Sequence, residues 1–223
     1  MPGLVGLLAL AYVVCAQFGA RLGPAWLTTF AVGCLVAAAL LPALWRGAAW
    51  ALAAALLAAL LLGAAVVGGA PRLPGYFVPP FLLALASAFF GRTLCAGSRP
   101  LIARIVLALD GPDFAAQPLV QRYARALTLA WTLLLAALAL FCLALGLMVR
   151  PDGLLALLGA PAPLSLDPAR WSLWVNLAGY GGVALAFAGE FAARRFLIPQ
   201  APRRPFVEFA RRVAALWPEL RQP

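Results

Sequence analysis

Histidine and lysine are absent from this chain of 223 residues, and only 11% of its residues are charged. Without an imidazole, the chain cannot form an HExxH zinc site, a Ser-His hydrolase, a histidine-dependent acyltransferase or a Cys-His condensing enzyme. No glycine-rich loop ends in Lys-Ser or Lys-Thr, which excludes a P-loop as well. We therefore expect no metal and no cofactor, and the absences favour a non-catalytic protein over an enzyme.

The cysteines are few and widely spaced. The four of them, Cys15, Cys34, Cys95 and Cys142, form no CxxC pair that could bind zinc or act in redox chemistry. Three lie inside apolar runs and Cys95 lies in the central connection, and neither setting favours a structural disulfide. We expect the three in the apolar runs to pack as small hydrophobic side chains.

Long hydrophobic runs dominate the sequence. Hydrophobic residues make up 65% of the chain, whereas soluble domains are about 45–50% apolar and about a quarter charged. Because a run of about 20 apolar residues can cross a bilayer as a helix, the sequence predicts an all-α, polytopic membrane protein with six transmembrane helices. The predicted helices cover residues 3–19, 25–45, 48–69, 76–90, 126–149 and 171–191.

Proline and glycine mark the ends of these helices. Gly23-Pro24 separates the first two, Arg46-Gly47 forms a tight turn after the second, and residues 70–75 form the next turn. Pro79-Pro80 is predicted to lie in the first turns of the fourth helix, where proline is tolerated.

The central connection, residues 91–117, is predicted to hold a short helix that lies in the head-group region without crossing the bilayer. Its apolar residues recur at helical spacing, with Arg104 away from their stripe, and Asp110-Gly111-Pro112-Asp113 ends the helix. Pro118 then begins a long helix whose first turns stand in water. The apolar stripe consists of Leu101, Ile102, Ile105, Val106 and Leu109.

A second surface helix is predicted in the basic tail. Residues 199–223 follow a transmembrane domain of residues 1–198, and the tail separates an apolar side from a charged side that carries Glu208, Arg211 and Arg212. Such an amphipathic helix is attracted to an anionic membrane surface. The apolar side consists of Phe206, Phe209, Ala210, Val213, Leu216 and Trp217.

The arginines predict the orientation in the membrane. With the N-terminus inside, four of the 17 arginines, Arg21, Arg72, Arg150 and Arg170, fall in outer connections, and the other 13 fall inside. Because basic residues stay cytoplasmic, we expect a multi-pass protein of the bacterial inner membrane with both termini inside. The net charge of +10 then favours anionic phospholipid as a partner over nucleic acid.

Two groups of polar residues are candidates for a functional site. The first lies at the inner membrane surface and suits an anionic head group, an acyl phosphate, a carrier-protein phosphopantetheine or a partner protein. The alternative interpretation is that these residues are ordinary interfacial side chains with no binding role. This group consists of Arg92, Thr93, Arg104, Tyr123, Arg125 and Trp131, beside Thr128.

The second group lies on the last predicted transmembrane helix. Asn176, Tyr180, Glu190 and Arg194 share one face at helical spacing. Glu190 lies near the C-terminal end of the helix, where the helix dipole disfavours an anion, so we expect a cationic partner, either Arg194 or Arg92. An intramembrane carboxylate is a functional candidate, and the alternative is a structural Glu–Arg clamp.

A resemblance appears at these same residues. The chain from 87 to 195 resembles a family of small bacterial inner-membrane proteins that occurs with genes for aryl-polyene, xanthomonadin-like pigments and is sometimes labelled ketosynthase. The resemblance implies a setting in acyl-chain pigment synthesis and no particular activity. The matching residues are Phe90-Gly91-Arg92-Thr93-Leu94, Gly97, Pro100-Leu101-Ile102, Arg104, Tyr123, Arg125, Thr128, Trp131, Trp171, Asn176, Tyr180, Gly189-Glu190 and Arg194-Arg195.

Three functions remain open at this point. The first is an accessory or docking protein whose arginine-rich cytoplasmic face holds a lipid-like intermediate, an acyl carrier protein or a pathway enzyme. The second is a small transporter or flippase for a hydrophobic product, to which a homodimer could supply the internal repeat that the sequence lacks. The third is a histidine-free membrane transferase that uses Glu190 or Asp110 as its base.

Overall fold

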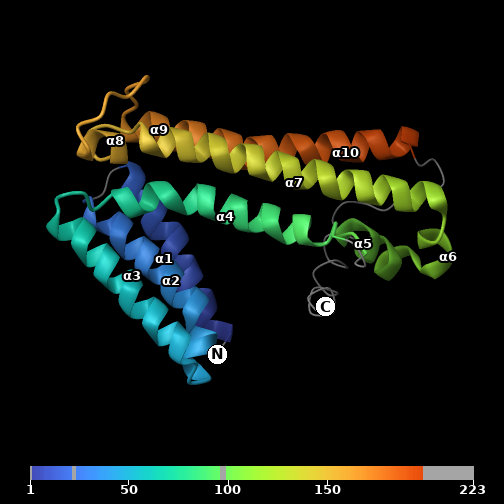
Figure 1. Ribbon diagram of the computed structural model, residues 1–223, viewed down its shortest axis with the longest axis horizontal. Helices are drawn as coiled ribbons and strands as arrows, with labels where there is room; N and C mark the ends of the chain where they lie inside the picture. Colours follow the sequence, from blue (N-terminus) through green and yellow to red (C-terminus); the bar gives the residue numbers. More distant parts are fainter. Residues whose placement is uncertain (1, 22–23, 96–98, 198–223) are drawn as a thin grey trace. The chain divides into compact units, whose positions relative to one another are not determined.

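The computed structural model describes residues 2–21, 24–95 and 99–197, and its regular elements are helices (Figure 1). The amphipathic helix predicted in the tail lies outside the described residues. Four helices precede the central connection, namely α1 (Pro2–Arg21), α2 (Trp26–Trp45), α3 (Ala49–Val67) and α4 (Leu73–Arg92). The others are α5 (Leu101–Asp110), α6 (Pro112–Ala115), α7 (Pro118–Leu147), α8 (Leu154–Leu157), α9 (Pro168–Asn176), the π-helical segment η1 (Leu177–Gly182) and α10 (Val183–Leu197).

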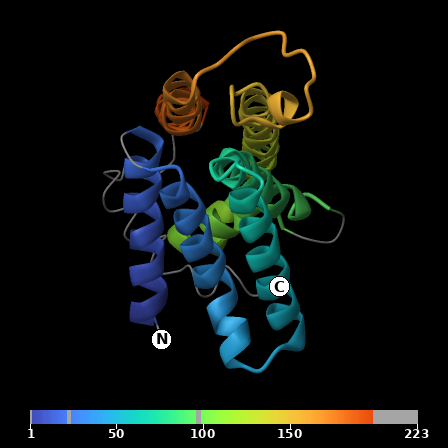
Figure 2. The ribbon, with the colours of Figure 1, turned by 90° about the vertical axis from the view of Figure 1, so that its left-hand side faces the viewer.

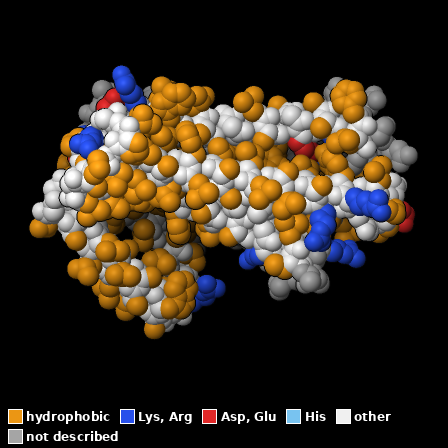
Figure 3. Space-filling view, turned by 45° about the horizontal axis from the view of Figure 1, so that its top comes forward, with side chains coloured by type: hydrophobic (Ala, Val, Ile, Leu, Met, Phe, Trp, Pro, Cys, Tyr) orange, Lys and Arg blue, Asp and Glu red, His pale blue; other side chains and the backbone are white. Residues whose placement is uncertain are grey.

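Five of the described helices are long and apolar enough to cross a membrane. They are α2, α3, α4, α7 and the continuous helix Pro168–Arg194 through α9, η1 and α10, whereas the apolar stretch of α1, Gly3–Gly19, is shorter. Hydrophobic side chains are spread over the face in Figure 3, and charged ones occupy only a few spots. The described chain is therefore all-helical, with several helices of membrane-spanning length.

Glycine ends α2 and α3 as the sequence predicts. At the end of α2, Gly47 has a φ of 71°, its N–H donates to the Leu44 carbonyl (2.9 Å), and the Ala48 N–H donates to the Ala43 carbonyl (3.1 Å). These two bonds define a Schellman motif, which satisfies the last carbonyls of a helix. Gly69, with a φ of 77°, ends α3 in the same way. Figure 2 shows α1, α2 and α3 side by side.

Two helices differ from the prediction. α4 begins at Leu73, three residues earlier than expected, so Pro79 and Pro80 lie inside the helix and not in its first turns. The first turn tolerates Pro74 because its N–H would have no partner in the helix. The last long helix contains the glycine-rich π-helical segment η1, which 3.6-residue periodicity does not reveal.

The chain divides into two compact units. Unit 1 comprises Met1–Phe81 and Ala139–Gly179, and unit 2 comprises Leu82–Leu138 and Tyr180–Pro223. Within unit 1, α1 packs on α2 and α9, and α2 packs on α3. Within unit 2, the second half of α4 is joined to α7 by the Ser87 hydroxyl, which donates to the Thr132 carbonyl at 2.8 Å.

Candidate functional site

The start of α5 is held by two threonine hydroxyls. Its N-cap residue is Pro100, which has no side chain that could accept a hydrogen bond from the first turn. Instead, the Leu101 N–H donates to Thr93 Oγ1 (3.0 Å) and the Ile102 N–H donates to Thr128 Oγ1 (3.4 Å). The first N–H groups of a helix need such partners. Thr93 and Thr128 therefore fix α5 to the end of α4 and to α7.

Both threonine side chains are buried. Thr93 is 6% exposed and Thr128 is 0% exposed. Their hydroxyls also donate to backbone carbonyls, that of Thr93 to Phe90 and that of Thr128 to Ala124, each at 2.7 Å. Thr93, a predicted head-group contact, is thus a buried capping residue.

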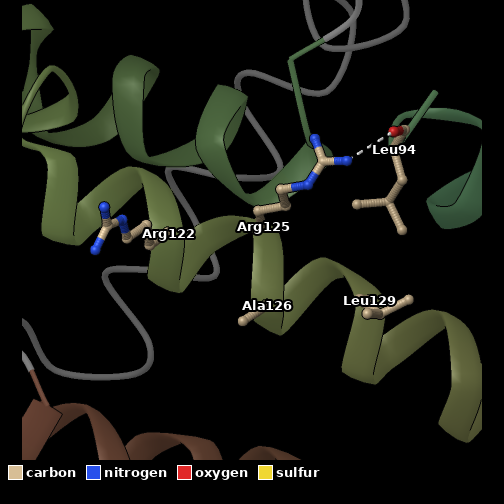
Figure 4. Close-up of a pocket in the computed structure, with 5 residues that line it drawn as sticks. All are labelled: Leu94, Arg122, Arg125, Ala126 and Leu129. Carbon is tan, nitrogen blue, oxygen red and sulfur yellow. Dashed lines mark hydrogen bonds between the residues drawn. The ribbon is translucent and has the colours of Figure 1, made fainter. Parts of the chain in front are cut away.

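An arginine-lined pocket lies beside the first turns of α7 (Figure 4). Four of its residues recur at positions i, i+3, i+4 and i+7 of the helix, which places them on one stripe. Leu94, just after α4, completes a cavity of about 370 Å³. Arg125 Nη2 donates to the Leu94 carbonyl at 3.4 Å. The stripe from α7 consists of Arg122, Arg125, Ala126 and Leu129.

The chemistry of this pocket suits an anion that carries an apolar chain. Arg122 and Arg125 lie within one turn of α7, and their guanidinium groups point in different directions beside the apolar lining of the pocket (Figure 4). Guanidinium matches the geometry of phosphate and carboxylate oxygens. Leu94, Ala126 and Leu129 supply apolar surface next to the two cations.

Tyr123 points away from this pocket and binds Glu190. Its hydroxyl donates to Glu190 Oε1 at 3.1 Å, and Arg194 Nε donates to the same oxygen at 3.0 Å. The carboxylate side chain is 14% exposed. This Tyr123–Glu190–Arg194 clamp joins α7 to α10 inside unit 2.

Of the two cations expected to pair with Glu190, the structure selects Arg194. Arg194 is one helical turn further along α10, so its guanidinium reaches the carboxylate at 3.0 Å. The expectation that Arg92 fills this position is wrong. The Arg92 guanidinium lies 4.6 Å from the centre of the Phe89 ring, in a cation–π contact at the end of α4.

Trp131 is a packing residue inside unit 2. It is 7% exposed, its ring lies 4.6 Å from that of Phe187 on α10, and it lies 6.4 Å from that of Phe90 on α4. Aromatic pairs at these distances stabilise the contact between helices. Trp131 therefore packs between helices of unit 2 and does not line the pocket.

The remaining predicted residues lie elsewhere. Arg104 Nε donates to the Arg99 carbonyl at 3.2 Å, at the surface of α5. Asn176 donates to Ser172 Oγ at 3.2 Å within unit 1, and Tyr180 is 73% exposed. The π-helical turns of η1 hold more residues than α-helical turns, so the regular spacing from Asn176 to Glu190 does not define one face.

The pocket contains two residues that were not singled out as a site, Arg122 and Leu94. The signal for Arg122 was present, because residues 122, 125, 126 and 129 form a helical stripe of two cations and two apolar residues. The position of Leu94 follows from the turn after α4 and could not be read from a pattern. Among the described residues, no group of three or more His, Cys, Asp or Glu side chains could hold a metal ion.

Comparisons of the chain with protein-family models, with curated proteins and with solved structures find no match.

Proposed function

We propose that the protein is a six-span protein of the bacterial inner membrane that binds an anionic amphiphile at the arginine-lined pocket. The ligand is a phosphate or carboxylate head group on an acyl or polyene chain. The protein then acts as an accessory component of acyl-chain synthesis, the setting that the pigment-family resemblance implies. The observation that carries the proposal is the pairing of Arg122 and Arg125 with apolar surface on one stripe of α7.

Six crossings follow if α1 is counted with the five helices that are long and apolar enough to cross a membrane. α1 has 20 residues, and at 1.5 Å per residue such a helix is about 30 Å long, which equals the hydrocarbon thickness of a bilayer. Six crossings put both termini on one side, and the arginine distribution favours the cytoplasm for that side. The pocket, next to the central connection, then faces the cytoplasm.

Cysteine labelling tests this topology. Cys95 is exposed in the central connection, whereas Cys34 and Cys142 are buried. A membrane-impermeant maleimide should label Cys95 in inverted vesicles and not in intact cells. Ser165→Cys in a Cys95→Ser background is the matched control, because Ser165 is exposed between α8 and α9 and should show the opposite pattern. Labelling of Cys95 from outside would reverse the topology.

Ligand binding tests the pocket. Purified protein in a maltoside detergent should bind dodecyl phosphate and not dodecanol, as measured by native mass spectrometry. Arg122→Gln with Arg125→Gln should weaken binding about thirtyfold, since each arginine contributes about 1 kcal/mol near an anionic group and 1.4 kcal/mol is tenfold. Arg170→Gln is the control, because Arg170 is an exposed arginine outside the pocket. An equal loss in the control would contradict a specific site.

A deletion strain tests the biological role. An accessory role in synthesis predicts that the strain loses the hydrophobic product or makes less of it. The double variant Arg122→Gln, Arg125→Gln should reproduce this loss while the protein is still inserted. Undiminished product that accumulates in the inner membrane would instead support transport.

A further inference from the structure

A second polar cluster lies in unit 1, at the N-terminal end of α4 and the C-terminal end of α7. We call Arg72, Tyr76, Asp152 and Trp171 the Tyr76 cluster. Arg72 Nη1 lies 3.4 Å from Asp152 Oδ2, and the rings of Tyr76 and Trp171 meet edge to face at 4.7 Å. Arg72 and Tyr76 lie four residues apart at the start of α4. The four side chains come from α4, α9 and the segments that flank α4 and α7.

Three donors of this cluster have no acceptor among the described residues. They are Arg72 Nε, the Tyr76 hydroxyl and Trp171 Nε1, and each of these atoms is inaccessible to solvent. Tyr76 is only 3% exposed and Trp171 is 8% exposed. Because buried polar groups in folded proteins are nearly always hydrogen-bonded, their acceptor must come from outside the described chain.

The charged side chains of the cluster reach the surface. The side chains of Arg72 and Asp152 are 32% and 16% exposed, whereas the two aromatic residues lie deeper. The backbone of Gly146 on α7 packs against Tyr76, since a Cβ at this glycine would lie 3.0 Å from the Tyr76 carbonyl oxygen. Tyr76 is therefore held in place. Because the three donor atoms are themselves covered, a ligand reaches them only when the partly exposed side chains of Arg72 and Asp152 move outward.

The position and charge of the cluster limit the class of ligand. It lies where α4 begins, α7 ends and α9 begins, which is head-group depth if these helices cross the membrane. One guanidinium and one carboxylate make the cluster electrically neutral. A simple anion would be repelled by Asp152 and a simple cation by Arg72, whereas a zwitterion satisfies both.

We propose that the Tyr76 cluster binds the head group of a zwitterionic phospholipid that carries a primary ammonium, such as phosphatidylethanolamine. The phosphate oxygens accept from Tyr76, Trp171 and Arg72, and the ammonium donates to Asp152. This proposal rests on the membrane crossing in the proposed function but not on the arginine-lined pocket.

Native mass spectrometry of the delipidated protein tests the proposal. Phosphatidylethanolamine, phosphatidylcholine and phosphatidylglycerol with identical acyl chains are compared in the Arg122→Gln, Arg125→Gln background, so that the pocket contributes little. We expect phosphatidylethanolamine to bind about tenfold more tightly than phosphatidylcholine, whose quaternary ammonium has no hydrogen to donate. Asp152→Asn should remove this preference, and Tyr76→Phe should weaken phosphatidylethanolamine binding about tenfold, the loss of one hydrogen bond to a charged group.

Several outcomes would overturn the proposal. Equal affinity for the three lipids, or no effect of Tyr76→Phe, would show that the three donors bond to water and not to a lipid head group. Soluble phosphoethanolamine that binds as tightly as the lipid would show that the ligand does not come from the membrane. Folding of each variant is checked by its circular dichroism spectrum in detergent. If dodecyl phosphate binding fails in wild type while the phosphatidylethanolamine preference persists, only the proposed function is lost.

Discussion

Each unit contains a tyrosine on a long apolar helix, in a cluster with one carboxylate and one arginine. The two tyrosines differ in whether the hydroxyl has a hydrogen-bond partner. In unit 2, Tyr123 donates to Glu190 at 3.1 Å and Arg194 binds the same carboxylate at 3.0 Å. In unit 1, Asp152 pairs with Arg72 at 3.4 Å, and the Tyr76 hydroxyl has no partner among the described residues. The first cluster is internally complete and serves to hold helices together. The second has three donors without an acceptor among the described residues, and this difference is the reason for the ligand proposed there.

Removal of the carboxylate from the complete cluster should have the largest effect. Glu190→Ala removes the acceptor that the Tyr123 hydroxyl and the Arg194 guanidinium share, and should lower the free energy of unfolding by about 2 kcal/mol. Titration of SDS into detergent micelles, followed by circular dichroism, measures this change. Asp167→Ala is not a suitable control because Asp167 caps α9. Arg170→Gln, which breaks the exposed pair with Asp167, should cost less than about 0.5 kcal/mol.

The next largest effect is expected at Tyr123, and it is measured by comparing the two tyrosines directly. Tyr123→Phe removes a hydrogen bond to a charged group and should destabilise the protein by about 1.5 kcal/mol. Tyr76→Phe removes a hydroxyl that bonds to nothing in the described chain, so in detergent without phospholipid it should be neutral or stabilising. The same SDS titration serves for both variants. An equal loss at the two positions would show that the clusters do not differ as described.

The smallest effect is expected at the cap of α5. Thr93→Val keeps the shape of the side chain but leaves the Leu101 N–H without its acceptor, at a cost of about 1 kcal/mol. Thr132→Val is the matched control, because the Thr132 hydroxyl donates only to the Thr128 carbonyl one turn earlier in α7. Hydrogen exchange at Leu101 should become faster in the first variant and stay unchanged in the second.

Helix ends were the part of the fold that the sequence predicted well. Gly47 and Gly69 end α2 and α3 because a positive φ suits glycine, and Gly111 follows α5 for the same reason. The prediction was less good where proline lies in a helix, at Pro79 and Pro80, because a proline can begin a helix or continue one when its neighbours pack well.

The candidate site was predicted only in part. Arg125 lies in the pocket and Glu190 has a cationic partner, as the pattern of charges indicated. The directions of Tyr123 and Trp131 could not be predicted, because both depend on the rotation of α10 against α7 within unit 2. Nor does periodicity reveal a π-helical segment such as η1, which changes the register of all residues that follow it.

The turn between α2 and α3 has a consequence for the synthesis of the protein. Only Arg46, Gly47 and Ala48 separate the two helices, and the Schellman bonds already satisfy the carbonyls at the end of α2. No independent loop exists that could remain in water while one helix enters the bilayer. In the proposed topology the two helices therefore leave the translocation channel together as a hairpin, with a single guanidinium retained at its tip.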